Sequence, residues 1–256
     1  MMTNTAEKLP SAPPAVARSS PTPPGWGKDE LTKFLQETHQ QQYATFVNKR
    51  QAIGRLIAID ALFVRVSEGW VNPSGPIGAM LFVRCHAALR AAASEAMAGQ
   101  VVESYRQCRG MLENAAYAVH LHRDPALAQV WLDRHKDEAG MKASRKAFQH
   151  ERVVASVTAA NTHAGKRFEE LYQRAIDFGG HPNERSVTGS MNMVEEPDRQ
   201  LVLAIMMHGD DAALDMALKS VAQCAMVSLE MLQVIYNPKF EILGINAAML
   251  ELRKGL

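Results

Sequence analysis

Residues 103–138 of this chain read ESYRQCRGMLENAAYAVHLHRDPALAQVWLDRHKDE. Apolar side chains in this stretch recur at spacings of three and four, which is typical of the buried face of an amphipathic helix. Arg123-Asp124-Pro125 interrupts the pattern. An aspartate can cap a following helix, and proline is tolerated at the first helical position. The stretch therefore predicts two helices joined at Arg123-Asp124-Pro125.

The same periodicity extends along most of the chain and predicts a mainly α, multi-helix bundle. Gly99 and the pair Gly179-Gly180 are placed to end two of the helices. Besides the helix that begins at Pro125, we expect either one very long helix over residues 28–69 or two helices with a break near Gly54. We also expect helices over residues 76–98, 101–121, 138–178, 210–236 and 237–252.

Residues 186–207 follow a different pattern. Ser186–Met193 alternates polar and apolar side chains, and a period of two is typical of a β-strand. Glu195-Glu196-Pro197-Asp198 predicts a turn, and the apolar run Leu201–Met207 predicts a second strand. We expect one small β-hairpin here, packed on the helices because an isolated hairpin is only marginally stable.

Composition limits the class of protein. Residues 1–26 hold six of the twelve prolines, which predicts a disordered Pro-rich tail ahead of a single all-α domain over residues 27–256. The net charge of +1 excludes a long-range field that would attract nucleic acid or an acidic membrane. The longest apolar run, Leu201–Met207, is too short to cross a bilayer, and the N-terminus has no apolar segment like that of a secretory signal. We expect a cytoplasmic protein.

One helix face carries the first candidate site. Arg106, Gly110, Glu113, Tyr117 and His120 are spaced by four, three, four and three residues, so they lie along one side of a helix. If the glutamate and the histidine are partly buried, they could bind a polar ligand or share a proton. The alternative is a structural role, in which an Arg–Glu pair orders neighbouring helices and the histidine bonds to the backbone.

A second candidate follows Trp131 in a run of mixed charge. Arg134 and His135 could together bind an anion. The alternative interpretation is a solvated, salt-bridged end of a helix, which contributes little to stability.

The third candidate is the loop after Gly179-Gly180. Loop residues held on a rigid scaffold are common functional positions. The alternative is turn chemistry, in which the loop residues only shape the chain. The side chains that offer donors, acceptors and charge are His181, Asn183, Glu184 and Arg185.

Motifs for metals and cofactors are missing from the sequence. Cys85, Cys108 and Cys224 lie far apart without a Cys-x-x-Cys pair, which is typical of reduced thiols packed in a core. The chain has no Glu-x-x-His, no His-Glu-x-x-His and no zinc-type spacing of Cys and His. It has no phosphate-binding Walker A or Gly-x-Gly-x-x-Gly motif either. We expect no metal and no cofactor.

Four short patterns are spread over residues 30–256. They are Arg106 with Glu113-Asn114-Ala115, Pro125 with Trp131-Leu132-x-Arg134-His135, the loop His181-Pro182-Asn183-Glu184, and Phe240-x-x-Leu243-Gly244-Ile245. Together they resemble an uncharacterised family of bacterial all-α proteins. The resemblance implies a helical fold and a bacterial source, and it implies no established activity.

A second resemblance concerns the Arg-x4–6-His motif. Arg145-Lys146-Ala147-Phe148-Gln149-His150 fits this motif, as does Arg174 with His181. In this respect the chain is similar to HEPN domains, which are helical, often dimeric and in many cases metal-independent ribonucleases of toxin or defence systems. The resemblance implies that His150 acts as acid and base and that Arg145 stabilises the developing phosphorane.

Two main hypotheses for function stay open, besides a hydrolase or transferase of a small polar substrate, which would need Glu113, His120 and the loop over residues 181–185 in one pocket. The first is a non-enzymatic all-α protein, a homodimer, that binds a small ligand or a protein partner and does not bind a membrane. The alternative is a HEPN-type ribonuclease, and nucleic acid is an expected partner only in that case.

Overall fold

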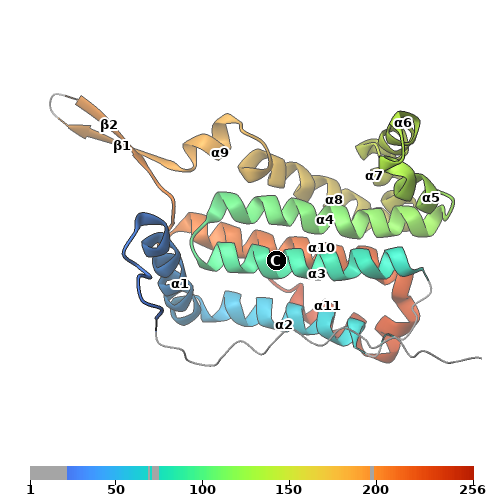
Figure 1. The fold of residues 1–256 in the computed structure, drawn as a ribbon. Coiled ribbons are helices and arrows are strands. Elements are labelled where there is room, and N and C mark those ends of the chain that lie inside the picture. The colour runs from blue at the N-terminus through green and yellow to red at the C-terminus, as the bar shows by residue number, and fades with distance from the viewer. Residues whose placement is uncertain (1–21, 69, 71–74, 197–198) are drawn as a thin grey trace, which may run out of the picture. The chain divides into compact units, whose positions relative to one another are not determined.

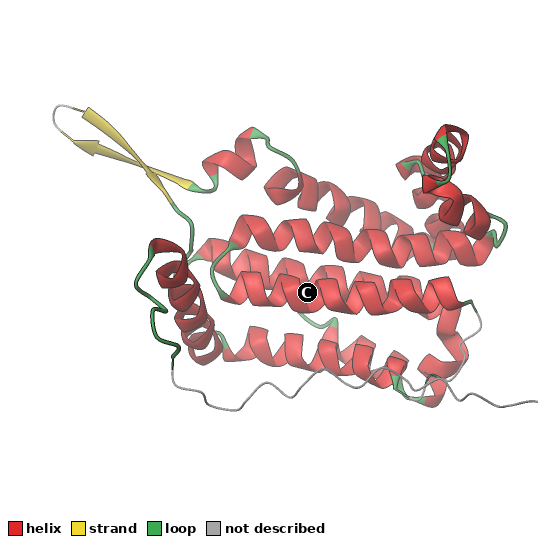
Figure 2. Ribbon diagram, in the orientation of Figure 1, coloured by secondary structure: helices red, strands yellow, loops and turns green. Residues whose placement is uncertain are grey.

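The structure is a computed structural model that describes residues 22–68, 70, 75–196 and 199–256. Across these ranges the chain is mainly α-helical, as its periodicity predicts (Figures 1 and 2). It divides into two compact units, Met1–Glu37 and Thr38–Leu256. Most of the predicted Pro-rich tail, residues 1–21, lies outside the described residues, and the single domain over residues 27–256 stays a prediction.

The described part of the first unit contains the start of α1 (Glu30–Asn48). Asp29 stands just before this helix, and its side chain accepts hydrogen bonds from the Thr32 N–H at 2.9 Å and from the Thr32 hydroxyl at 2.6 Å. These bonds lower the pKa of the Asp29 carboxyl. An ionised carboxylate at this position also interacts favourably with the positive N-terminal end of the helix dipole, which explains why α1 begins here.

The second unit is built mainly from long helices that pack side by side. Its helices are α2 (Arg50–Ser67), α3 (Pro76–Met97), α4 (Val101–Arg123), α5 (Leu127–Leu132), α6 (Glu138–Ala147), α7 (His150–Ala160), α8 (Thr162–Ala175), α9 (Glu184–Thr188), α10 (Ala212–Ile242) and α11 (Ile245–Leu252), with a 3-10 turn at Asp133–His135 and a π-helical turn at Ile176–Gly180. α3, α4 and α10 pack against one another, α2 packs mainly on α10, and α8 packs on α4 and α10 (Figure 1).

α10 runs through the core of the second unit. Its predicted apolar stripe is buried along its whole length, at Leu214, Leu218, Val221, Ala225, Leu229 and Leu232. Within the described residues, α10 is the one helix with the length and apolar composition to cross a membrane, and 72% of its apolar window is buried inside the protein. Burial of this kind is also what the core helix of a folded bundle shows.

The predicted helices over residues 76–98 and 101–121 are confirmed by α3 and α4. The prediction of one long helix over residues 138–178 is wrong, because α6, α7 and α8 occupy most of this stretch. Gln149 has an extended backbone between α6 and α7. Asn161 is extended between α7 and α8, and its side chain accepts the Ala164 N–H at 3.0 Å. Asparagine competes for backbone groups in this way, so it starts a new helix where apolar periodicity alone would continue the old one.

Three other helix boundaries differ from the predicted ones. The first long helix breaks at Lys49, between α1 and α2, and not at Gly54, which lies inside α2. α5 begins at Leu127 rather than at Pro125, which lies in a turn. α10 continues past its predicted end to Ile242 and kinks at Tyr236. The kink comes just before a proline, which lacks the N–H that a regular helix needs.

The segment between α9 and α10 forms two strands, β1 (Met191–Glu196) and β2 (Arg199–Ala204) (Figure 2). They pair antiparallel, with Met191 opposite Ala204. The predicted strand start at Ser186 is wrong, because this residue lies in α9. Ser186 and Asn183 form a capping box there, in which each side chain accepts a hydrogen bond from the other's backbone N–H. The middle of the predicted turn, residues 197–198, lies outside the described residues.

Candidate functional site

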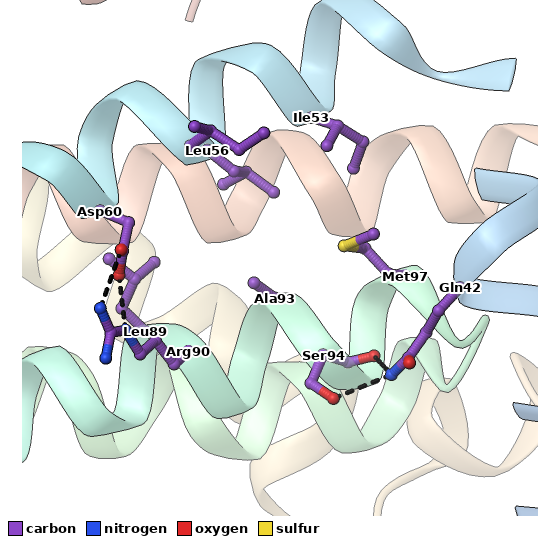
Figure 3. Close-up of a pocket in the computed structure, with 10 residues that line it drawn as sticks. Gln42, Ile53, Leu56, Asp60, Leu89, Arg90, Ala93, Ser94 and Met97 are labelled. Atoms are coloured by element: carbon purple, nitrogen blue, oxygen red, sulfur yellow. Dashed lines mark hydrogen bonds and ion pairs between the residues drawn. The ribbon is translucent and has the colours of Figure 1, made fainter. Parts of the chain in front are cut away.

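A cleft of about 380 Å³ lies between α2 and α3, with Gln42 of α1 at one end (Figure 3). Small-molecule sites are typically concave, mostly apolar and about 300–1,000 Å³ in volume. The walls of this cleft are apolar and come from two helices: Ile53, Leu56 and Ile57 from α2, and Leu89, Ala93 and Met97 from α3.

The cleft exists because α2 packs mainly on α10 and leaves the side of α3 open. Ile53 and Leu56 are buried at the base, whereas the next residue, Ile57, is 57% exposed at the rim. Ala93 stands in the wall between larger side chains and fills little space. The small side chain at this position therefore helps to keep the cleft open.

A charged cluster lies at one end of the cleft (Figure 3). Asp60 accepts two hydrogen bonds from Arg90, Nε at 2.8 Å and Nη2 at 3.0 Å, and it lies 2.6 Å from Nε2 of His86. The bonds from Arg90 lower the pKa of Asp60, against a burial that would raise it. Asp60 is therefore ionised and holds the arginine in place, while the Arg90 side chain is 60% exposed.

The other end of the cleft is closed by neutral hydrogen bonds. Gln42 Nε2 donates to the Ser94 carbonyl at 3.0 Å and to the Ser94 hydroxyl at 2.9 Å (Figure 3). The Thr45 hydroxyl donates to the Met97 carbonyl at 2.8 Å. These bonds tie the part of α1 that belongs to the second unit to the last turns of α3. The charge of the cleft is thus confined to the Asp60 and Arg90 end.

The predicted stripe on α4 does not line this cleft, and its members separate into different contacts. Arg106 Nε donates to the Gly179 carbonyl at 3.0 Å. Glu113 accepts from Arg109 Nε at 2.9 Å and from the Tyr172 hydroxyl at 3.0 Å. The arginine that pairs with Glu113 is therefore Arg109 and not Arg106. Burial, together with the Glu113 carboxylate, raises the pKa of Tyr172 to about 12.

His120 lies in the core, with 5% of the residue exposed. Its Nε2 is 3.1 Å from the Ala147 carbonyl, and its Nδ1 is 2.7 Å from the Ser156 hydroxyl. A carbonyl only accepts, so Nε2 donates, and in the neutral ring Nδ1 accepts from the serine. Burial lowers the pKa of this imidazole. The histidine thus joins α4, α6 and α7. Its ring centroid lies 5.2 Å from that of Phe148, which in turn packs 5.0 Å from the ring of Tyr117.

The lowered pKa of His120 predicts a loss of stability in acid. The unfolded chain, with an ordinary histidine pKa of about 6.5, binds a proton more readily than the folded protein, so stability falls as the pH drops below about 6.5. His120→Gln removes the titrating group and should reduce this fall between about pH 7.5 and pH 5 in urea unfolding. The exposed His122→Gln is the control and should keep the parent's pH dependence. Equal pH dependence in the parent and His120→Gln would contradict the prediction.

The remaining predicted residues are mostly exposed and lie on separate elements. Arg134 and His135 are exposed on the 3-10 turn after α5. In the third candidate, His181 and Glu184 are exposed, while Asn183 caps α9. Arg106 of the stripe bonds to Gly179 in the π-helical turn just before this loop, and neither the stripe nor the loop lines the cleft.

The two residues of the HEPN motif lie on successive helices. Arg145 is exposed on α6. His150 begins α7, and its half-buried ring stacks on Tyr172 with 4.4 Å between the ring centroids. The ribonuclease hypothesis stays a prediction, and incubation of intact tRNA with the purified parent and His150→Ala tests it.

The cleft was missed by our sequence reasoning. His86 and Arg90 are four residues apart on one helix, and this spacing places both on one face. That pair is the available signal. Their shared acceptor, Asp60, lies on the preceding helix, 26 residues before His86, so no local pattern connects them.

Within the described residues, no group of three or more His, Cys, Asp or Glu side chains is placed to hold a metal ion. Comparisons of this chain with protein-family models, with curated proteins and with solved structures found no match.

Proposed function

We propose that this is a non-enzymatic binding protein whose cleft between α2 and α3 holds one small amphipathic molecule. The observation that supports the proposal is the separation of the apolar walls from a charged cluster at one end. An apolar body would replace water along Leu56, Leu89 and Met97, and burial of apolar surface is the main driving force for such binding.

The charged end selects the polar group of the ligand. Nε and Nη2 of Arg90 are bonded to Asp60, and among the described residues its Nη1 has no partner. A guanidinium donates hydrogen bonds and accepts none, so the ligand must present an acceptor such as a carboxylate, a sulfonate or a carbonyl. From Arg90 to Met97 the helix rises about 10 Å, which sets the length of the apolar body.

A fluorescent probe of this chemistry, 1-anilinonaphthalene-8-sulfonate, tests the proposal by titration of the full chain. Ala93→Trp fills the cleft and should weaken binding about tenfold or more, because the apolar body loses its place. Ala87→Trp makes the same change at an exposed position of α3 that does not line the cleft, and it should leave binding unchanged.

Ile57→Glu is a second variant that tests the proposal even if the tryptophan of Ala93→Trp disturbs packing. This residue lies at the exposed rim, and a carboxylate there repels the sulfonate without crowding the core. Weak probe binding to the parent, or equal affinity in the parent, Ala93→Trp and Ile57→Glu, would contradict the proposed function.

Native mass spectrometry of the purified full chain tests two further expectations. A fixed extra mass would give the mass of a retained ligand, and the number of chains in the particle would test the expected homodimer. The cytoplasmic location stays a prediction.

A further inference from the structure

A second cavity, of about 430 Å³, lies where α4 and α10 begin, and it shares no residue with the cleft. α9 and the π-helical turn form its other side. Much of its lining is apolar: Val101, Val102, Phe178, Ala213 and Met216. Three features give this cavity a defined polar side.

The first feature is His208, whose backbone is fixed against the loop between α3 and α4. Its N–H donates to the Gly99 carbonyl at 2.8 Å. Gly99 has a φ of +76°, and a Cβ there would stand 2.2 Å from the His208 carbonyl oxygen. Only glycine permits both this conformation and this close approach.

The ring of His208 is also fixed. Nδ1 lies 2.9 Å from Asp211 Oδ2, and the side chain is only 10% exposed. Burial tends to raise the pKa of Asp211, but hydrogen bonds from the Leu214 N–H and from His208 lower it, so the carboxylate is ionised. An ionised carboxylate only accepts, so Nδ1 donates to it. Nε2 has no partner among the described residues and remains available to a ligand in the cavity.

The second feature is Arg185 on the opposite side. Its guanidinium lies 5.8 Å from the centroid of the Phe178 ring, and Nη1 is 3.7 Å from Asp177 Oδ2. More than half of the side chain is exposed, so its remaining donors can reach a ligand. Arg185 belongs to the loop that the sequence singled out, and the structure places it on this cavity.

The third feature is the start of α4. Gln100 stands at the N-cap position but makes no side-chain hydrogen bond to the first turn. Val101 and Val102, the first two residues of this helix, line the cavity. The Val101 N–H already donates to the Gly99 carbonyl at 3.0 Å, so the first turn offers the Val102 N–H to the cavity. At the positive end of a long helix this donor favours an anion, and it adds to the guanidinium across the cavity.

We infer that this cavity binds a small organic acid with an aromatic or branched apolar body. The body packs on Phe178 and Met216, and the oxyanion group lies between Arg185 and the first turn of α4. Because Nδ1 of His208 donates to Asp211, Nε2 carries a hydrogen only in the protonated ring, and it is this imidazolium that donates Nε2–H to the oxyanion. The hydrogen-bond donors suit a carboxylate or a phosphate monoester, which present the same acceptor oxygens.

Isothermal titration calorimetry of the full chain with phenyl phosphate and with benzoate tests the inference and separates the two acids. Arg185→Gln should weaken binding of whichever acid has the higher affinity about tenfold, since it removes a charge-assisted hydrogen bond. His208→Gln should weaken it as well. Arg145→Gln removes an exposed arginine on α6 and should have no effect. Because Arg185 is on the surface, its replacement leaves the core intact.

Ala93→Trp separates this cavity from the cleft and should leave acid binding unchanged. The inference is overturned if neither acid binds the parent at millimolar concentration, if Arg185→Gln binds as well as the parent, or if Ala93→Trp abolishes binding. The last result would place the acid in the cleft instead.

Discussion

Phe82→Ala should lower the free energy of unfolding by about 4 kcal/mol, the usual cost of removing a buried aromatic ring and leaving a cavity. Phe82 is fully buried on α3. Its ring centroid is 5.4 Å from that of Phe63, 4.9 Å from Trp70 and 6.0 Å from Tyr236. These rings come from α2, α10 and the segment after α2, so collapse into the vacated space would have to move several elements at once.

Urea unfolding and calorimetry measure this loss. For a chain of this size we expect the midpoint temperature to fall by about 10 °C. Met80→Ala is a matched control on the same helix, because this side chain is exposed, and it should change stability by less than about 0.5 kcal/mol. A loss below about 1 kcal/mol for Phe82→Ala would show that the aromatic cluster is not part of the rigid core.

Arg253→Ala should cost about 3 kcal/mol, because it leaves a buried carboxylate without its main partner. The Glu230 side chain is only 5% exposed on α10. Its Oε1 is 2.5 Å from Arg253 Nη2, and its Oε2 is 3.2 Å from Nδ1 of the exposed His163. The arginine lies just after α11, so the ion pair fastens the C-terminal end of the chain to the core.

A double variant distinguishes the cost of an unpaired buried charge from the cost of lost packing. Glu230→Gln together with Arg253→Ala removes the buried charge as well, and it should recover a large part of the stability measured by urea unfolding. Lys254→Ala, beside the same site but in an exposed pair with Glu251, should show no measurable change. If the double variant is no more stable than Arg253→Ala, the cost comes from lost packing and not from an unpaired charge.

The fold was predictable where one regular pattern continues without local competition. The helices predicted over residues 76–98 and 101–121 match α3 and α4 within two residues at each end. The stretch over residues 138–178 failed because Asn161 takes an extended conformation and caps a new helix. Periodicity reports which face is apolar and is insensitive to such a break, because α7 and α8 both bury an apolar stripe.

For the candidate site residues, too, the local pattern was predictable and the contacts were not. The stripe on α4 is a real helix face, yet its members have unrelated partners: Gly179 for Arg106, Tyr172 for Glu113, and Ser156 for His120. Those partners lie between 36 and 73 residues away along the chain. Side chains at a known spacing can be assigned to one face, but what they meet across that face depends on how distant helices pack.

Local sequence is enough to establish a mainly α protein with long amphipathic helices and an apolar stripe along α10, because helix formation depends on residues three and four apart. The cleft, the second cavity and the fixed ring of His208 come from long-range packing. Each depends on the distance between helices that meet only after the chain has folded. That distance is set by the fit of all buried side chains together, and no single stretch of the sequence contains it.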